Sequence, residues 1–79
     1  MVLEKLLIPK GYKRIPTGQA SEEAWQKGNV RIIRKIYKFP PKVIIHVSGT
    51  QRRSTRNLDG HYQEGKDDYQ LQALWRELK

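Results

Sequence analysis

Apolar residues near the start of the chain recur with the spacing of a helix. They occupy positions 2, 3, 6 and 7, which lie on one side of a short helix. Pro9 and Gly11 follow directly, and both residues are typical of the end of a helix. The sequence therefore predicts a short amino-terminal helix.

A second helical pattern closes the chain. Its apolar positions stand at i, i+3, i+4 and i+7, which are Leu71, Leu74, Trp75 and Leu78. Asp67 is placed to cap this helix and Gln70 lies three residues later, as in a capping box. Acidic residues at its start and basic residues at its end also suit the helix dipole. We therefore predict an amphipathic carboxyl-terminal helix.

Strand patterns occupy the middle of the chain. In Lys42 to Ser48, apolar positions 43, 45 and 47 alternate with their neighbours, which predicts a strand. A shorter strand is expected over Tyr12 to Ile15, ended by Pro16. The Gly28-Asn29 dipeptide suits a two-residue hairpin turn after the segment that starts at Trp25.

The segment Val30 to Phe39 fits both a strand and a helix. As a strand, it puts two basic residues on the same face as its apolar residues Val30, Ile32 and Ile36, namely Arg34 and Lys38. This arrangement requires either a bulge or a sheet that is exposed to solvent on both faces. As a helix, it gathers all four of its basic residues on one side. We favour the strand, because a ten-residue helix rich in Ile and Val and ending at a proline has poor intrinsic propensity.

The remaining segment is polar and rich in turn residues. Residues 48–57 predict a basic loop or a frayed strand. Asp59-Gly60 and Glu64-Gly65 predict turns on either side of His61 and Tyr62.

These elements define the expected fold, a single small basic α+β domain over residues 1–79. It has a short amino-terminal helix, a small antiparallel sheet of about three strands, and the carboxyl-terminal amphipathic helix packed on that sheet. So small a chain leaves little room for a deep active-site cleft. The candidate core residues are Leu3, Leu6, Leu7, Ile15, Trp25, Val30, Ile32, Ile36, Val43, Ile45, Val47, Leu71, Leu74, Trp75 and Leu78.

Amino-acid composition bears on the cellular compartment and on the kinds of binding site that we expect. Cysteine is absent, so neither disulfides nor thiolate zinc sites hold the fold together. The longest apolar runs are far shorter than the roughly 20 residues that span a bilayer, and no signal peptide is recognisable. The two histidines and scattered carboxylates form no ligand-spaced cluster. We expect a cytoplasmic protein without a membrane segment, cofactor or metal.

Charge provides the main functional indication. The chain carries a net charge of +8, and no Asp or Glu occurs between Ala24 and Leu58. Because phosphate contacts by Lys and Arg release condensed counterions, such a stretch is typical of a surface that binds nucleic acid. We therefore predict a non-enzymatic domain that binds the phosphate backbone of RNA or DNA through Arg31, Arg34, Lys35, Lys38, Arg52, Arg53 and Arg56.

Tyr37 and Phe39 interleave with these cations. Exposed aromatic rings stack on bases, although packing on a hairpin is the commoner role and is the one we favour for both.

Alternative functions start from the same residues. The chain could be a protein-interaction module, such as a small regulator or inhibitor from a mobile element, that docks its basic surface on an acidic protein. An exposed edge at residues 43–45 could also pair two copies into a homodimer. A metal-independent ribonuclease would use His46 with Arg52 or Arg53, or His61 with Tyr62 and Asp59. The sequence leaves open both the choice between RNA and DNA and any catalytic role of the histidines.

Overall fold

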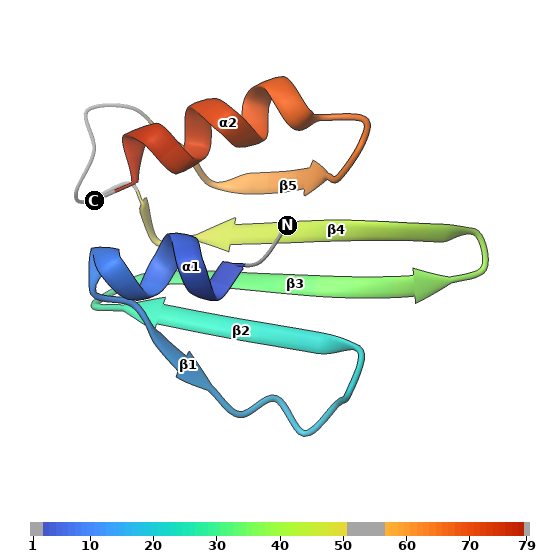
Figure 1. Ribbon diagram of the computed structural model, residues 1–79, viewed down its shortest axis with the longest axis horizontal. Helices are drawn as coiled ribbons and strands as arrows, with labels where there is room; N and C mark the ends of the chain where they lie inside the picture. Colours follow the sequence, from blue (N-terminus) through green and yellow to red (C-terminus); the bar gives the residue numbers. More distant parts are fainter. Residues whose placement is uncertain (1–2, 51–56, 79) are drawn as a thin grey trace.

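A computed structural model describes residues 3–50 and 57–78 as an antiparallel sheet with helices from both ends of the chain (Figure 1). The elements are α1 (Leu3–Leu7), η1 (Ile8–Lys10), β1 (Lys13–Ile15), β2 (Glu22–Lys27), β3 (Val30–Lys38), β4 (Pro41–Ser48), β5 (Gly60–Gln63) and α2 (Asp68–Glu77). Both predicted helices are present, and the expected α+β class is confirmed.

The sheet is larger than the sequence predicted. Its five strands run in the order β1-β2-β3-β4-β5, and each pair of neighbours is antiparallel. The expectation of about three strands was therefore wrong. The strand that sequence reasoning missed most clearly is β5, which we had read as a segment between two turns. It pairs with β4 through Ile44↔Gln63 and Ile45↔Tyr62.

The ambiguous segment is a strand, as we favoured. Its ladder with β4 runs without interruption from Arg31↔Ser48 to Lys38↔Pro41, so no bulge relieves the mismatch in its polarity. Arg34 consequently lies on the same side of the sheet as Ile32. It is accommodated there because its guanidinium forms an ion pair with Glu64, with Nε donating to Oε2 at 2.6 Å.

One side of the sheet carries the core. Buried strand residues such as Trp25, Ile32 and Ile45 form one hydrophobic cluster with leucines of α1 and α2. Most predicted core residues belong to this cluster. Three do not: Ile15 and Val43 are only partly buried, and Ile36 has 46% of its surface exposed. Tyr12 and Leu58, which we had not predicted, are buried members.

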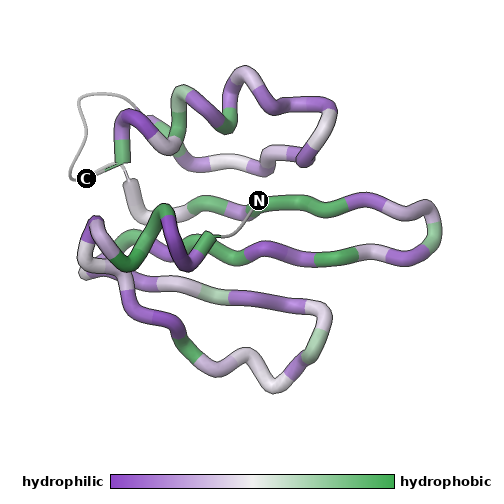
Figure 2. Tube along the Cα trace, viewed as in Figure 1, coloured by the Kyte–Doolittle hydropathy of each residue, from purple (hydrophilic) through white to green (hydrophobic). Residues whose placement is uncertain are grey.

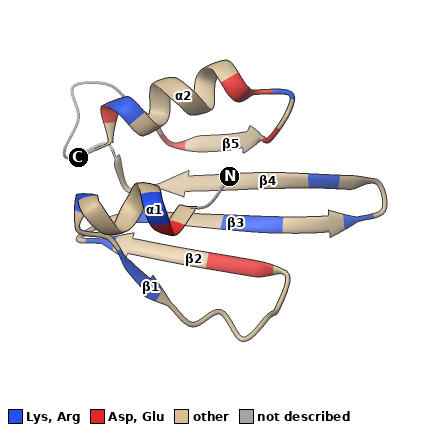
Figure 3. Cartoon of the chain, in the orientation of Figure 1, with Lys and Arg blue, Asp and Glu red and all other residues tan. Residues whose placement is uncertain are grey.

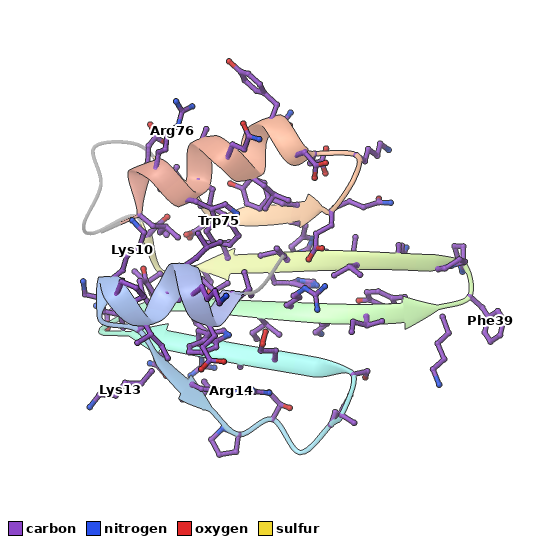
Figure 4. The ribbon with its side chains drawn as sticks, in the orientation of Figure 1. Lys10, Lys13, Arg14, Phe39, Trp75 and Arg76 are labelled. Carbon is purple, nitrogen blue, oxygen red and sulfur yellow. The ribbon has the colours of Figure 1, made fainter. Side chains whose placement is uncertain are left out.

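The two ends of the chain meet on this covered side. The Lys10 ammonium donates a hydrogen bond to the Leu78 carbonyl oxygen at 2.9 Å (Figure 4). At the start of α2, Asp67 occupies the N-cap position but its side chain makes no cap hydrogen bond. Its Oδ2 instead accepts the backbone N–H of Gln63 at 2.8 Å, which ties α2 to β5.

The edge that we expected to pair two copies is not available. Residues 43–45 lie inside β4, whose neighbours are β3 and β5. Because both sides of this segment are hydrogen-bonded within the chain, it cannot template a homodimer. None of the helices in the described part of the chain has the length and hydropathy needed to cross a bilayer.

Candidate nucleic-acid interface

The helices of residues 3–50 and 57–78 pack on one side of the sheet, and we call the other side the open face. Side chains alternate along each strand, so the cross-strand rows Lys13-Gln26-Arg31-Ser48 and Ile15-Ala24-Ile33-His46-His61 lie on it. The cluster of core residues contains none of these side chains. Ile33 and His46 are partly exposed, whereas Ala24 is covered by its larger neighbours.

Cations gather on the open face. Arg31 is exposed on β3, Lys35 follows four residues later on the same face, and Lys42 lies beside Tyr37 on the adjoining hairpin. Lys13 adds a cation on β1. The carboxylate that the described strands contribute to this face is Glu22, opposite Lys35. Figure 3 shows the basic positions of β1, β3 and β4 and the acidic pair at the start of β2.

These cations keep their charge available for a ligand. Within residues 3–50 and 57–78, neither Lys35 nor Lys42 forms an ion pair. The Lys42 ammonium lies 5.2 Å from the centroid of the Tyr37 ring, and the Arg31 guanidinium makes one long contact of 3.5 Å with the Gln26 side-chain oxygen.

The predicted site residues are not all brought together. Arg31 and Lys35 share the open face, and Lys38 lies at the end of the β3–β4 hairpin. Arg34 faces the other way, where hydrogen bonding to Glu64 raises its pKa above the ordinary arginine value. Three further predicted residues lie outside the described part of the chain: Arg52, Arg53 and Arg56.

Two histidines meet on the open face where β4 pairs with β5, the strand at one edge of the sheet. The register pairs His46 with His61, and their ring centroids are 4.3 Å apart. Burial lowers the pKa of His46, and the positive charges of His61 and Lys35 lower it further. The neutral imidazole is therefore favoured. Sequence reasoning had considered each histidine separately and missed the pair, because it had not recognised β5.

The catalytic groupings proposed for His61 do not assemble. The Tyr62 hydroxyl points to the covered side and donates to the Leu58 carbonyl oxygen at 2.7 Å. Asp59 accepts hydrogen bonds from the backbone N–H and hydroxyl of Thr50, which lower its pKa. Moreover, Nε2 of His46 is buried without a hydrogen-bond partner among the described residues.

Aromatic side chains mark the far end of the β3–β4 hairpin. Phe39 is 93% exposed and points away from the molecule at the turn (Figure 4). Tyr37 is 39% exposed. The expectation that both rings pack on the hairpin is thus wrong for Phe39. Apolar positions continue along the hairpin toward this end (Figure 2).

Known proteins offer no further guide. Comparison with models of protein families gives no match, and the same holds for curated proteins and for solved structures. Within the described ranges, no group of three His, Asp or Glu side chains is placed to hold a metal ion. The functional argument therefore depends on the geometry of the open face.

Proposed function

We propose that this protein is a non-enzymatic nucleic-acid-binding domain that holds the phosphate backbone on the open face. The observation that carries the proposal is the placement of Arg31, Lys35 and Lys42 on the side of the sheet that the helices leave uncovered. Arg34 leaves the predicted set because Glu64 already neutralises it. Lys13 joins the set from β1.

Electrostatics supports this assignment. Arg31, Lys35, Lys42 and Lys13 outnumber Glu22, the carboxylate that the described strands place on the open face. Such an excess of positive charge attracts a polyanion, and each phosphate neutralised releases counterions. The strands keep the cations at fixed positions, because every one of them stands on a hydrogen-bonded ladder. Backbone contacts of this kind position a strand of nucleic acid without reading its sequence.

The decisive experiment compares two variants with equal net charge. In the first, Arg31, Lys35 and Lys42 are replaced by Gln. In the matched control, three exposed cations elsewhere are replaced by Gln, namely Lys5, Lys66 and Arg76. Both variants lose three positive charges, so only the position of the charges differs.

Affinity is measured by titrating labelled single-stranded and double-stranded RNA and DNA over a series of salt concentrations. Each phosphate contact contributes a slope of roughly −0.7 (single strand) to −0.9 (duplex DNA) in log K against log salt. We expect the open-face variant to lose roughly two to three units of slope, while the control keeps the wild-type slope. Equal losses in the two variants would refute an open-face site and leave only a general charge effect.

A protein partner is the second candidate, and the apolar centre of the open face favours it. Ile15, Ile33 and Ile44 are partly exposed there, and a phosphate backbone would not need them. An acidic protein that covers this centre would form a complex that survives nuclease treatment. Recovery of nucleic acid alone would argue against it.

The ribonuclease alternative has weaker support. A general base must reach the proton that it removes, and Nε2 of His46 is buried without a hydrogen-bond partner among the described residues. Among the described residues, hollows lie beside α1 and α2, and neither histidine lines these hollows.

A further inference from the structure

The outer part of the β3–β4 hairpin extends beyond the rest of the sheet. Pairing with β2 ends at Glu22↔Lys35, apart from one hydrogen bond of 2.9 Å from the Ile36 N–H to the Ser21 carbonyl. Pairing with β5 ends at Ile44↔Gln63, apart from a hydrogen bond of 2.9 Å between Glu64 and Val43. Beyond these points the two strands pair with each other, and Figure 1 shows the hairpin reaching past β2 and β5.

Phe39 occupies the free end of this hairpin. With 93% of its surface exposed, the ring contributes almost nothing to the packing of the protein. A single exposed apolar side chain is ordinary on a protein surface and needs no function. Phe39 is different in its position, because the hairpin holds the ring away from the body of the molecule (Figure 4).

Cations flank this ring in the sequence, and the register places Lys42 on the open face and Lys38 on the opposite face of the hairpin. Lys38 precedes it directly, and Lys42 lies three residues after it, beside Tyr37. The sequence has no carboxylate between Ala24 and Leu58, so the whole hairpin is free of acidic residues. The partner that complements the end of the hairpin is therefore anionic and also carries a flat apolar group. A nucleotide has both properties, since its phosphate is anionic and its base has an apolar face.

The hairpin is continuous with the open face. Lys35 and Lys42 lie on that face and also lead along the hairpin toward Phe39. A strand of nucleic acid bound to the open-face cations would thus reach the ring without changing direction. This continuity favours nucleic acid over a lipid surface, which would contact the free end of the hairpin alone.

We propose that Phe39 inserts beside an unstacked base of the bound nucleic acid, while Lys38 and Lys42 hold the flanking phosphates. The inference rests on the proposed function, since it places one more contact on the same ligand. Apolar side chains of other nucleic-acid-binding proteins enter base steps in this way, and a two-stranded ribbon is narrow enough to approach a groove.

The test uses three variants of the full chain: Phe39→Ala, Phe39→Tyr and Tyr69→Ala. The last is the matched control, because Tyr69 is an aromatic residue that is 80% exposed but lies on α2, away from the hairpin. Neither Phe39 nor Tyr69 is buried, so each variant should fold. Labelled single strands and duplexes of 20 nucleotides are titrated at several salt concentrations. Binding to vesicles of phosphatidylglycerol and phosphatidylcholine is measured in parallel.

We expect Phe39→Ala to weaken binding to single strands by roughly 5- to 150-fold, the range for loss of one stacked base. The salt slope should stay unchanged, because stacking releases no counterions. Phe39→Tyr should retain nearly all the affinity, and Tyr69→Ala should match the wild type.

The outcomes separate the two proposals. If the wild type binds no probe, the proposed function and this inference both fail. If the wild type binds with a steep salt slope and Phe39→Ala binds equally well, stacking is refuted while the phosphate contacts stand. If Phe39→Ala instead loses binding only to anionic vesicles of phosphatidylglycerol and phosphatidylcholine, the ring is a membrane contact and the inference is overturned.

Discussion

Replacing Gly49 by Ala tests how closely the end of β4 approaches the β2–β3 turn. Gly49 has a φ of +80°, a conformation that costs an L-residue about 1–2 kcal/mol. An added Cβ would also overlap the carbonyl oxygen of Asn29 and lie 2.7 Å from its carbon. Both neighbours are backbone atoms, so no side chain can rotate to relieve the contact.

The steric part of the cost can be isolated by comparison with Gly18. That residue has a φ of +75°, but nothing lies within 4 Å of its added Cβ. Gly18→Ala therefore carries the backbone strain alone, about 1 kcal/mol once the reduced freedom of the unfolded chain is considered. Gly49→Ala must in addition displace the backbone of Asn29. Overpacking of this kind costs about 1–3 kcal/mol. We expect a total loss of about 2–4 kcal/mol for Gly49→Ala.

Urea unfolding measures both variants directly. Trp25 and Trp75 are buried, so their fluorescence reports the loss of the core. The free energies of unfolding should differ by at least about 1 kcal/mol, with Gly49→Ala the less stable. Equal stability of the two variants would refute the close backbone approach.

Two further predictions concern groups on opposite sides of the sheet. The side chains of Arg34 and Glu64 are both only about one-fifth exposed. We therefore expect Arg34→Gln and Glu64→Gln each to lower the free energy of unfolding by roughly 1–3 kcal/mol, with strong coupling in a double-mutant cycle. Additive losses would contradict the ion pair. Since the pKa of His46 is lowered in the folded state, the unfolded chain takes up its proton first as the pH falls. Stability should therefore decline below about pH 6.5, and His46→Gln should reduce this decline; an unchanged pH dependence would show that His46 is not responsible.

Local patterns were enough to predict the helices and the central strands. The spacing of Leu71, Leu74, Trp75 and Leu78 predicted α2, and the alternation around Ile45 predicted β4. For β3 the pattern alone was insufficient, since Arg34 breaks the alternation. Its partner Glu64 is thirty residues away in sequence, and no local rule reveals such a pair.

The size of the sheet could not be predicted for a similar reason. The strand β5 has four residues and lies between two turn signals. Its stability comes from pairing with β4 and from the contact of Asp67 with Gln63, both of which require the fold. Missing β5 also concealed the His46–His61 pair and made the β4 segment seem to be an edge.

The candidate site was predictable only as a stretch of charge. Counting residues located the basic segment, but it treated Arg31, Arg34 and Lys35 alike. Their separation onto two faces follows from the register of β3, and so does the exclusion of Arg34. The exposure of Phe39 depends on the length of the hairpin relative to its neighbours, which the sequence of the hairpin does not contain.

The strand order has a consequence for the way this chain folds. Each strand pairs with the next one in sequence, so every ladder closes only a short loop and loses little chain entropy in forming. The contact between Lys10 and Leu78, by contrast, joins residues 68 positions apart. The sheet can therefore assemble hairpin by hairpin. Joining the two ends of the chain costs little entropy only after the strands between them have formed.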